Sequence, residues 1–152
     1  MDDGDVDVGR VAIGAACAIF DDRGRVLLVR HTYGRLNWEL PGGGSEPGEP
    51  PDATARRELL EETGLEVPID GLAGVDFEAG HETGPMLHFV FRCRWDPTHI
   101  PVASSPEIAE VGFWPPDGLP TPISDFTERR IRDAIAEHTA AVVTIGARRW
   151  RA

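Results

Sequence analysis

The most restrictive feature of this chain is a run of glycines followed by a helix that has clear start and stop signals. Pro41-Gly42-Gly43-Gly44 predicts a sharp loop, because glycine adopts torsions that other residues avoid. Pro50-Pro51-Asp52 opens a helix, where proline is tolerated in the first turn. Gly64 can end that helix in the left-handed conformation. The sequence therefore predicts a helix that ends near Thr63.

Three carboxylates on one face of this helix indicate metal chemistry. Glu58, Glu61 and Glu62 have i, i+3 and i+4 spacing, so they project within an arc of about 100°. Such a cluster weakens a helix by repulsion unless hard divalent cations lie among the oxygens, which suits magnesium or manganese. Alone, the pattern is typical of a solvated acidic face. The upstream glycines, which present bare carbonyls and amides to metal or phosphate, favour a binding site.

Spacing within this segment identifies a resemblance to a known family. It reads Gly43, five residues, Glu49, seven residues, Arg57-Glu58-Leu59, one residue, Glu61-Glu62, one residue, then Gly64-Leu65. This matches the signature of the Nudix hydrolases without a departure, and chance would give it on the order of once in ten million chains of this length. Flanking segments are also similar, so roughly Val11 to His138 can be laid on the family fold.

The resemblance implies a fold and a set of site residues. The fold is an α/β/α sandwich with a mixed sheet between helices. The implied metal ligands are the carboxylates of Glu58, Glu61 and Glu62 with the carbonyl of Gly42; Arg57 and Glu49 form the supporting ion pair, and Gly43 and Gly44 contact substrate. Glu58 or a downstream glutamate would be the base. Glu107 and Glu110 are both candidates for a further ligand or base, and the sequence does not choose between them.

The implied reaction is magnesium-dependent, or manganese-dependent, hydrolysis of the diphosphate linkage in a nucleoside diphosphate joined to another group. By elimination, the substrates are (deoxy)nucleoside triphosphates or nucleotide sugars. One alternative is a nucleotide-sensing module that has lost catalysis, although such modules usually lose carboxylates that are all present here. An isoprenyl diphosphate isomerase would need a well-placed cysteine, and an RNA-cap hydrolase would need a basic patch.

The remaining patterns predict a strand–helix–strand–helix order, which itself favours a mixed sheet between helices. Expected strands are Val11–Phe20, Val26–Arg30, Leu72–Glu78, Met86–Trp95 and Val111–Trp114, and a second helix is expected over Thr127–His138. The apolar run Ala140–Ile145 predicts an edge strand or an oligomer contact, so a homodimer is one interpretation. Residues 1–8 are expected to be a flexible acidic tail and residues 9–152 a single domain.

Composition restricts the partners. The net charge is -11, from 26 acidic and 15 basic residues, and every basic residue is arginine. This balance works against binding nucleic acid or anionic membranes and suits a protein that recruits cations to a small nucleotide. Val11–Phe20 is too short to span a bilayer and follows acidic residues, unlike a signal peptide. With Cys17 and Cys93 interpreted as buried free thiols, the chain is expected to be cytoplasmic.

Aromatic residues offer two interpretations. Trp38, Phe77, Phe89 and Trp114 could stack a nucleobase, but filling the core is the favoured role for each. His81 and His88 are interpreted as ordinary loop or strand residues, because no Cys/His ligand cluster accompanies them. Arg30 and Arg35 are candidates for phosphate or ribose contacts, and equally for ordinary surface arginines.

Overall fold

The computed structural model describes residues 9–136 and 141–152. The expected tail over residues 1–8 and the expected helix end at His138 lie outside this part. The elements in chain order are β1 (Ala12–Ile19), β2 (Val26–His31), β3 (Trp38–Glu39), β4 (Gly42–Gly44), α1 (Pro51–Thr63), β5 (Ile69–Glu78), β6 (Met86–Cys93), β7 (Ile108–Trp114), β8 (Ile123–Ser124), α2 (Asp125–Ile135), β9 (Ala141–Ile145) and β10 (Trp150–Arg151).

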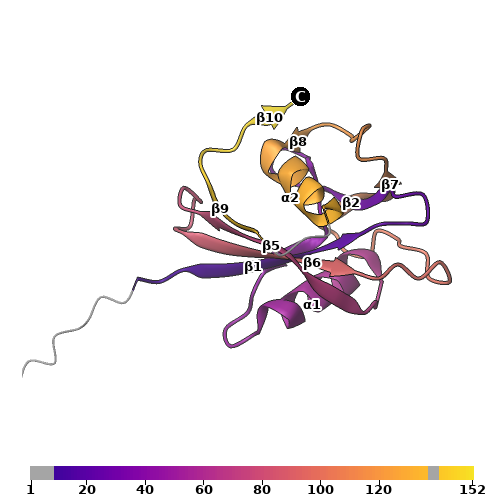
Figure 1. Cartoon of the computed structure of the whole chain (residues 1–152), viewed down its shortest axis with the longest axis horizontal. Coiled ribbons are helices and arrows are strands. Elements are labelled where there is room, and N and C mark those ends of the chain that lie inside the picture. Colours follow the sequence, from indigo (N-terminus) through magenta and orange to yellow (C-terminus); the bar gives the residue numbers. More distant parts are fainter. Residues whose placement is uncertain (1–8, 137–140) are drawn as a thin grey trace, which may run out of the picture.

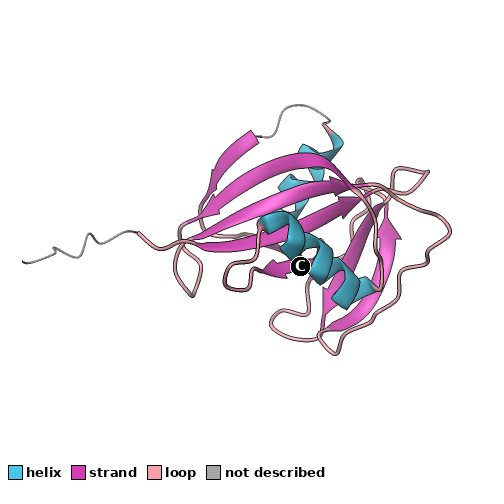
Figure 2. Cartoon of the chain, turned by 90° about the horizontal axis from the view of Figure 1, so that it is seen from below, coloured by secondary structure: helices cyan, strands magenta, loops and turns pink. Residues whose placement is uncertain are grey.

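The strands form two mixed sheets. Sheet A has the order β4-β1-β6-β5-β9 and sheet B has the order β10-β8-β3-β2-β7. In sheet A, β1 runs parallel to β6 and antiparallel to β4. Helix α1 covers one face of sheet A and α2 lies on the other side, as Figure 1 shows from the side and Figure 2 from below. The predicted class, a mixed sheet between helices, is confirmed. The division of the strands between two sheets was not predicted.

Strand β1 is apolar throughout because both of its faces are buried. Ala15, Cys17 and Ile19 point into a core that also contains Leu59 of α1. Their neighbours Ala16 and Ala18 point into a second core, which joins both sheets to α2. A strand buried on both faces has no reason to alternate with polar residues, which explains the unbroken hydrophobic run.

Most predicted elements are confirmed, with shifted ends. Helix α1 ends as predicted, with Gly64 in the left-handed region at φ 75°. Helix α2 starts two residues earlier than expected, because the hydroxyl of Ser124 accepts a hydrogen bond from the Thr127 amide at 3.1 Å and caps the helix. Strand β9 pairs in parallel with β5, so the run after residue 140 forms an edge strand. The short strands β3, β4, β8 and β10 were not predicted. The prediction of a sharp loop with unusual torsions at Pro41–Gly44 was wrong, because Gly42–Gly44 pair with β1 as a strand and none of them has a positive φ.

Two further predictions concern the cysteines and the membrane. Cys17 and Cys93 are free and buried, as expected, and the thiol of Cys17 donates to the Ala55 carbonyl at 3.6 Å. Across residues 9–136 and 141–152, no helix has the length and apolar character needed to cross a bilayer.

Candidate active site

The glycine strand β4 lies close to both β1 and α1, and at Gly42 a side chain would collide with the backbone of β1. A Cβ on Gly42 would meet the Ala16 Cα at 2.7 Å, and a Cβ on Gly43 would lie 2.6 Å from the carboxyl carbon of Glu58. Real Cβ atoms do not make such contacts with backbone. The glycines therefore let the backbone of β4 touch the glutamate face of α1, which brings two of the predicted site segments together.

Glu62 is the most constrained carboxyl group of the helix. It is only 5% exposed, and its Oε1 accepts a hydrogen bond from the Gly42 amide at 3.3 Å. Its Oε2 is buried without a hydrogen-bond partner among the described residues. Burial and, to a smaller extent, the neighbouring carboxylate of Glu58 together raise the pKa of Glu62 to about 9. Burial also raises the pKa of Glu58, against the opposing effect of Arg57.

Arg57 connects the helix to the loop that precedes it. Its guanidinium donates to both carboxylate oxygens of Glu49, at 2.8 and 2.9 Å, and to the Gly44 carbonyl at 3.0 Å. The same group lies 3.0 Å from a Glu58 oxygen and 3.3 Å from a Glu61 oxygen. Arg57 holds the pKa of Glu49 down at about 2, with help from the Thr54 hydroxyl. The predicted Arg57–Glu49 pair is therefore present as a bidentate contact.

The carboxyl groups of α1 repel one another when they are ionised, and a divalent cation among them would offset this repulsion. The charge of the nearby Glu58 raises the pKa of Glu62, and the buried Oε2 of Glu62 has no hydrogen-bond donor among residues 9–136 and 141–152. A bound cation would supply the missing positive charge at that oxygen. The described residues contain no compact group of three or more His, Cys, Asp or Glu side chains placed as a complete metal centre. Glu61 is half-exposed and contacts Arg57, so the helix presents two close carboxyls and a third at its rim.

A cavity of about 320 Å³ lies beside the glycine strand. Its lining includes all three glycines of β4, the aromatic pair His31 and Tyr33, and side chains from β3, β6, α2 and the C-terminal segment. Because Gly42 and Gly43 also contact the α1 carboxyl groups, the cavity and those groups share one backbone strand. A phosphate chain lying along β4 would reach both.

Charged side chains line this cavity and pair with buried carboxylates behind it. They were not predicted from the sequence as site residues. Arg130 of α2 donates to Glu39 at 3.1 Å, and its Nε lies 3.9 Å from Asp76. Arg148 lies 2.7 Å from Glu78. Arg130 has no local sequence pattern that marks it, because its role depends on β3 and β5 packing against α2. Glu39 lies shortly before the glycine strand β4 in the sequence, and this proximity was the one signal that could have marked it as a site residue.

The other residues considered from sequence have varied positions. Trp38 and Trp114 pack edge to face in the core, with ring centroids 5.3 Å apart, which confirms the packing interpretation. Arg30 donates to the Leu36 carbonyl at 3.0 Å and lies 4.0 Å from Glu110. The guanidinium of Arg35 lies over the Trp150 ring at 4.7 Å. The choice between Glu107 and Glu110 as a further ligand or base stays open.

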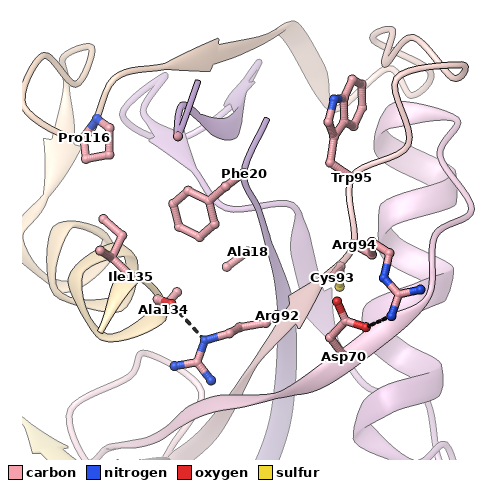
Figure 3. Close-up of a pocket in the computed structure, with 11 residues that line it drawn as sticks. Ala18, Phe20, Asp70, Arg92, Cys93, Arg94, Trp95, Pro116, Ala134 and Ile135 are labelled. Atoms are coloured by element: carbon pink, nitrogen blue, oxygen red, sulfur yellow. Dashed lines mark hydrogen bonds and ion pairs between the residues drawn. The ribbon is translucent and has the colours of Figure 1, made fainter. Parts of the chain in front are cut away.

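A second cavity, of about 740 Å³, lies near the C-terminal end of α2 and has no such chemistry (Figure 3). Arg92 donates to the Ala134 carbonyl at 2.8 Å, and Arg94 lies 2.6 Å from Asp70, so both cations are already engaged. None of the lining residues belongs to Gly43–Leu65. The smaller cavity beside β4 is therefore the better candidate for the reaction.

Comparison with known proteins finds relatives of this chain. The NUDIX domain family matches residues 10–134. A MutT-like protein of Streptomyces ambofaciens is 32% identical over 124 residues, which cover 82% of this chain and 77% of that protein. An ADP-ribose pyrophosphatase of Mycobacterium tuberculosis is 53% identical over 62 residues, but these cover 38% of this chain and 28% of that protein.

The fold also has solved counterparts. The crystal structure of a MutT NUDIX hydrolase from Burkholderia pseudomallei superposes with a TM-score of 0.73 at 24% identity. The superposition covers 82% of this chain and 98% of that protein. At this identity the likeness concerns the fold, and it agrees with the arrangement of sheets and helices described above.

Proposed function

Because the chain belongs to the Nudix hydrolase family, we propose that it hydrolyses a phosphoanhydride bond in a nucleoside diphosphate linked to another group. The observation that carries the proposal is the buried Glu62 carboxyl near Glu58 and the glycine strand, whose Oε2 has no hydrogen-bond partner in the described part of the chain. Such an arrangement is costly in a protein without a cationic ligand. A divalent cation held at this carboxyl group would offset that cost.

The proposed roles follow from the contacts. Glu58, Glu61 and Glu62 would hold magnesium or manganese together with the Gly42 carbonyl. When bound, the cation supplies charge neutralisation on the phosphates and lowers the pKa of water. Arg57 and Glu49 fix the loop against the helix. The proposed contacts of the phosphate oxygens are with the backbone of Gly43 and Gly44.

In the proposed reaction, the oxygen of a water molecule forms a bond to one phosphorus and the bridging oxygen on that phosphorus leaves. A carboxylate accepts the proton from water. We favour Glu58 for this role because its carboxyl group lies against Gly43 of the glycine strand. The products are a nucleotide and the remaining phosphorylated group.

The substrate class belongs to the proposal as well. The expected substrates are (deoxy)nucleoside triphosphates or nucleotide sugars, and the name of one relative, ADP-ribose pyrophosphatase, supports a nucleoside diphosphate joined to a sugar. A small nucleotide agrees with the net charge of -11, since an acidic protein reaches an anion through cations. We extend the proposal to a cytoplasmic protein that binds no nucleic acid. A homodimer is a further expectation that size measurement in solution would decide.

The test is product release from a panel of nucleoside triphosphates, nucleotide sugars and dinucleotides, with and without magnesium. We expect metal-dependent turnover of one class. Glu61→Gln and Glu62→Gln should each lower kcat by on the order of 100-fold or more, the scale of losing one group that stabilises transition-state charge. Glu66→Gln is the matched control, because this exposed glutamate lies just beyond the signature. Full activity in either ligand variant would refute the metal assignment, and metal-dependent binding without turnover would favour a sensing module.

A further inference from the structure

An exposed aromatic ring stands at the rim of the cavity. Tyr33 follows β2 in the loop of residues 32–36 and is 54% exposed. One face of its ring is covered by His31, with centroids 4.8 Å apart and planes only 11° from parallel. Both rings line the cavity bordered by Gly42–Gly44. Trp38 and Trp114 are packed in the core, and Phe126, which also lines the cavity, is 3% exposed beneath Arg130 and Arg148. Tyr33 is therefore the better candidate for a ligand-facing ring.

The loop that carries Tyr33 is held by contacts on several sides. The Leu36 amide donates to the Tyr33 carbonyl at 3.0 Å, and the Thr32 amide donates to the Glu107 carbonyl at 2.9 Å. Arg35 packs over the Trp150 ring, which ties the loop to the C-terminal segment. A ring presented on a braced loop loses little conformational freedom when a ligand covers it, so binding there has a low entropic cost.

The same cavity contains a further polar group. His88 is 8% exposed and lines the cavity, and its Nε2 lies 3.3 Å from the Glu78 carboxylate without forming a hydrogen bond among the described residues. Burial and the charge of Arg130 together lower the pKa of His88 to about 4, against the opposing charge of Glu78, so the ring is neutral near pH 7. A neutral imidazole can donate to or accept from the edge of a heterocycle. The cavity thus combines a stacking face with a hydrogen-bonding group.

We propose that Tyr33, backed by His31, is the surface on which the nucleobase of the substrate stacks. The inference rests on the proposed function, because it gives a place to the base of a nucleotide whose phosphates lie along β4. A base presents a flat π face, which matches a ring that is already in parallel stacking on its other side. Such stacking tolerates any base, so Tyr33 selects nucleotides over phosphoanhydrides that have no base.

The test compares two ligands that differ in the nucleoside. Equilibrium binding of ADP and of inorganic diphosphate is measured in magnesium for the wild-type chain and for Tyr33→Ala. We expect the variant to bind ADP about 5- to 100-fold more weakly and inorganic diphosphate within about twofold of the wild type. Tyr33→Phe should keep ADP affinity, since the ring remains. Leu36→Ala is the matched control, because Leu36 is 47% exposed on the same loop and does not line the cavity.

The outcomes separate this inference from the proposed function. An equal loss of affinity for ADP and diphosphate in Tyr33→Ala, or no loss for ADP, would overturn the stacking role even if hydrolysis is confirmed. A selective loss of ADP affinity would support it even in a chain that binds nucleotides without cleaving them. Absence of ADP binding by the wild-type chain would overturn the inference directly.

Discussion

At the residue scale, Glu62 sets the chemistry of the site because its burial conflicts with its charge. The carboxyl is enclosed by α1 and β4, receives one hydrogen bond from Gly42, and leaves Oε2 without a partner in the described part of the chain. Without a cation, the group avoids the cost of a buried charge by holding its proton. A divalent ion would replace that proton, so metal binding and proton release are expected to be linked at this position.

This linkage predicts how stability depends on pH. The folded pKa of Glu62 is raised from 4.5 to about 9, so the folded chain holds a proton that the unfolded chain releases. The resulting stabilisation is complete below pH 4.5 and is lost as pH rises towards 9. We expect metal-free wild-type protein to lose stability over this range relative to Glu62→Gln, whose amide stays neutral. Urea unfolding at pH 5, 7 and 9 measures the difference, and parallel pH dependences of the two proteins would contradict the prediction.

At the element scale, Arg57 determines whether the loop before α1 stays on the helix. Its contacts with Glu49 and the Gly44 carbonyl join the two segments. We predict that Arg57→Ala lowers kcat/KM by about 10- to 100-fold, as is usual for residues that support a metal site, and also lowers the melting temperature. Steady-state kinetics and thermal unfolding test both effects.

Arg57→Lys serves as the comparison, because it keeps the charge but cannot form the bidentate pair with Glu49. It should recover less than half of the lost activity on a logarithmic scale. Complete recovery by lysine would mean that charge alone matters, and it would remove the argument from loop geometry.

Local signals explain which elements could be predicted from the sequence. Helix α1 was predictable because Pro51 and Gly64 mark its ends within the chain itself. Strands β3 and β8 have two residues each, and they exist because Trp38 pairs with Ile123, far away in sequence. No periodicity can develop over two residues. For the same reason the sequence did not show that the strands divide between two sheets.

The candidate site divides in the same way. The glutamates of α1 and their arginine were predictable, because helical spacing alone places them together. Arg130, Glu39 and Tyr33 were not identified as site residues, because only the packing of α2 and of the 32–36 loop brings them to the cavity beside β4. The sequence thus predicted the glutamate and arginine half of the candidate site, and the half that lines the cavity beside β4 required the fold.

At the scale of the whole molecule, a segment beyond the matched family domain helps to complete the cavity. The family match ends at residue 134, whereas Arg148 lines the cavity and pairs with the buried Glu78 of β5. Strand β10 pairs with β8, and the Arg149 carbonyl accepts from the Asp125 amide at 2.9 Å. These contacts support the prediction that residues 9–152 fold as one domain.

The prediction can be tested through the Arg148–Glu78 pair. Arg148→Met should lower the free energy of unfolding by about 3 kcal/mol, because Glu78 is 4% exposed and would keep a buried charge without its cation. Adding Glu78→Gln should restore much of this loss, since the amide carries no charge. Arg149→Met is the control, because Arg149 is exposed and leaves the pair intact. Urea unfolding of the four proteins measures these differences. A loss of unfolding free energy below about 0.5 kcal/mol in Arg148→Met would fall in the range of ordinary surface substitutions. It would mean that the C-terminal segment does not unfold together with the rest of the domain.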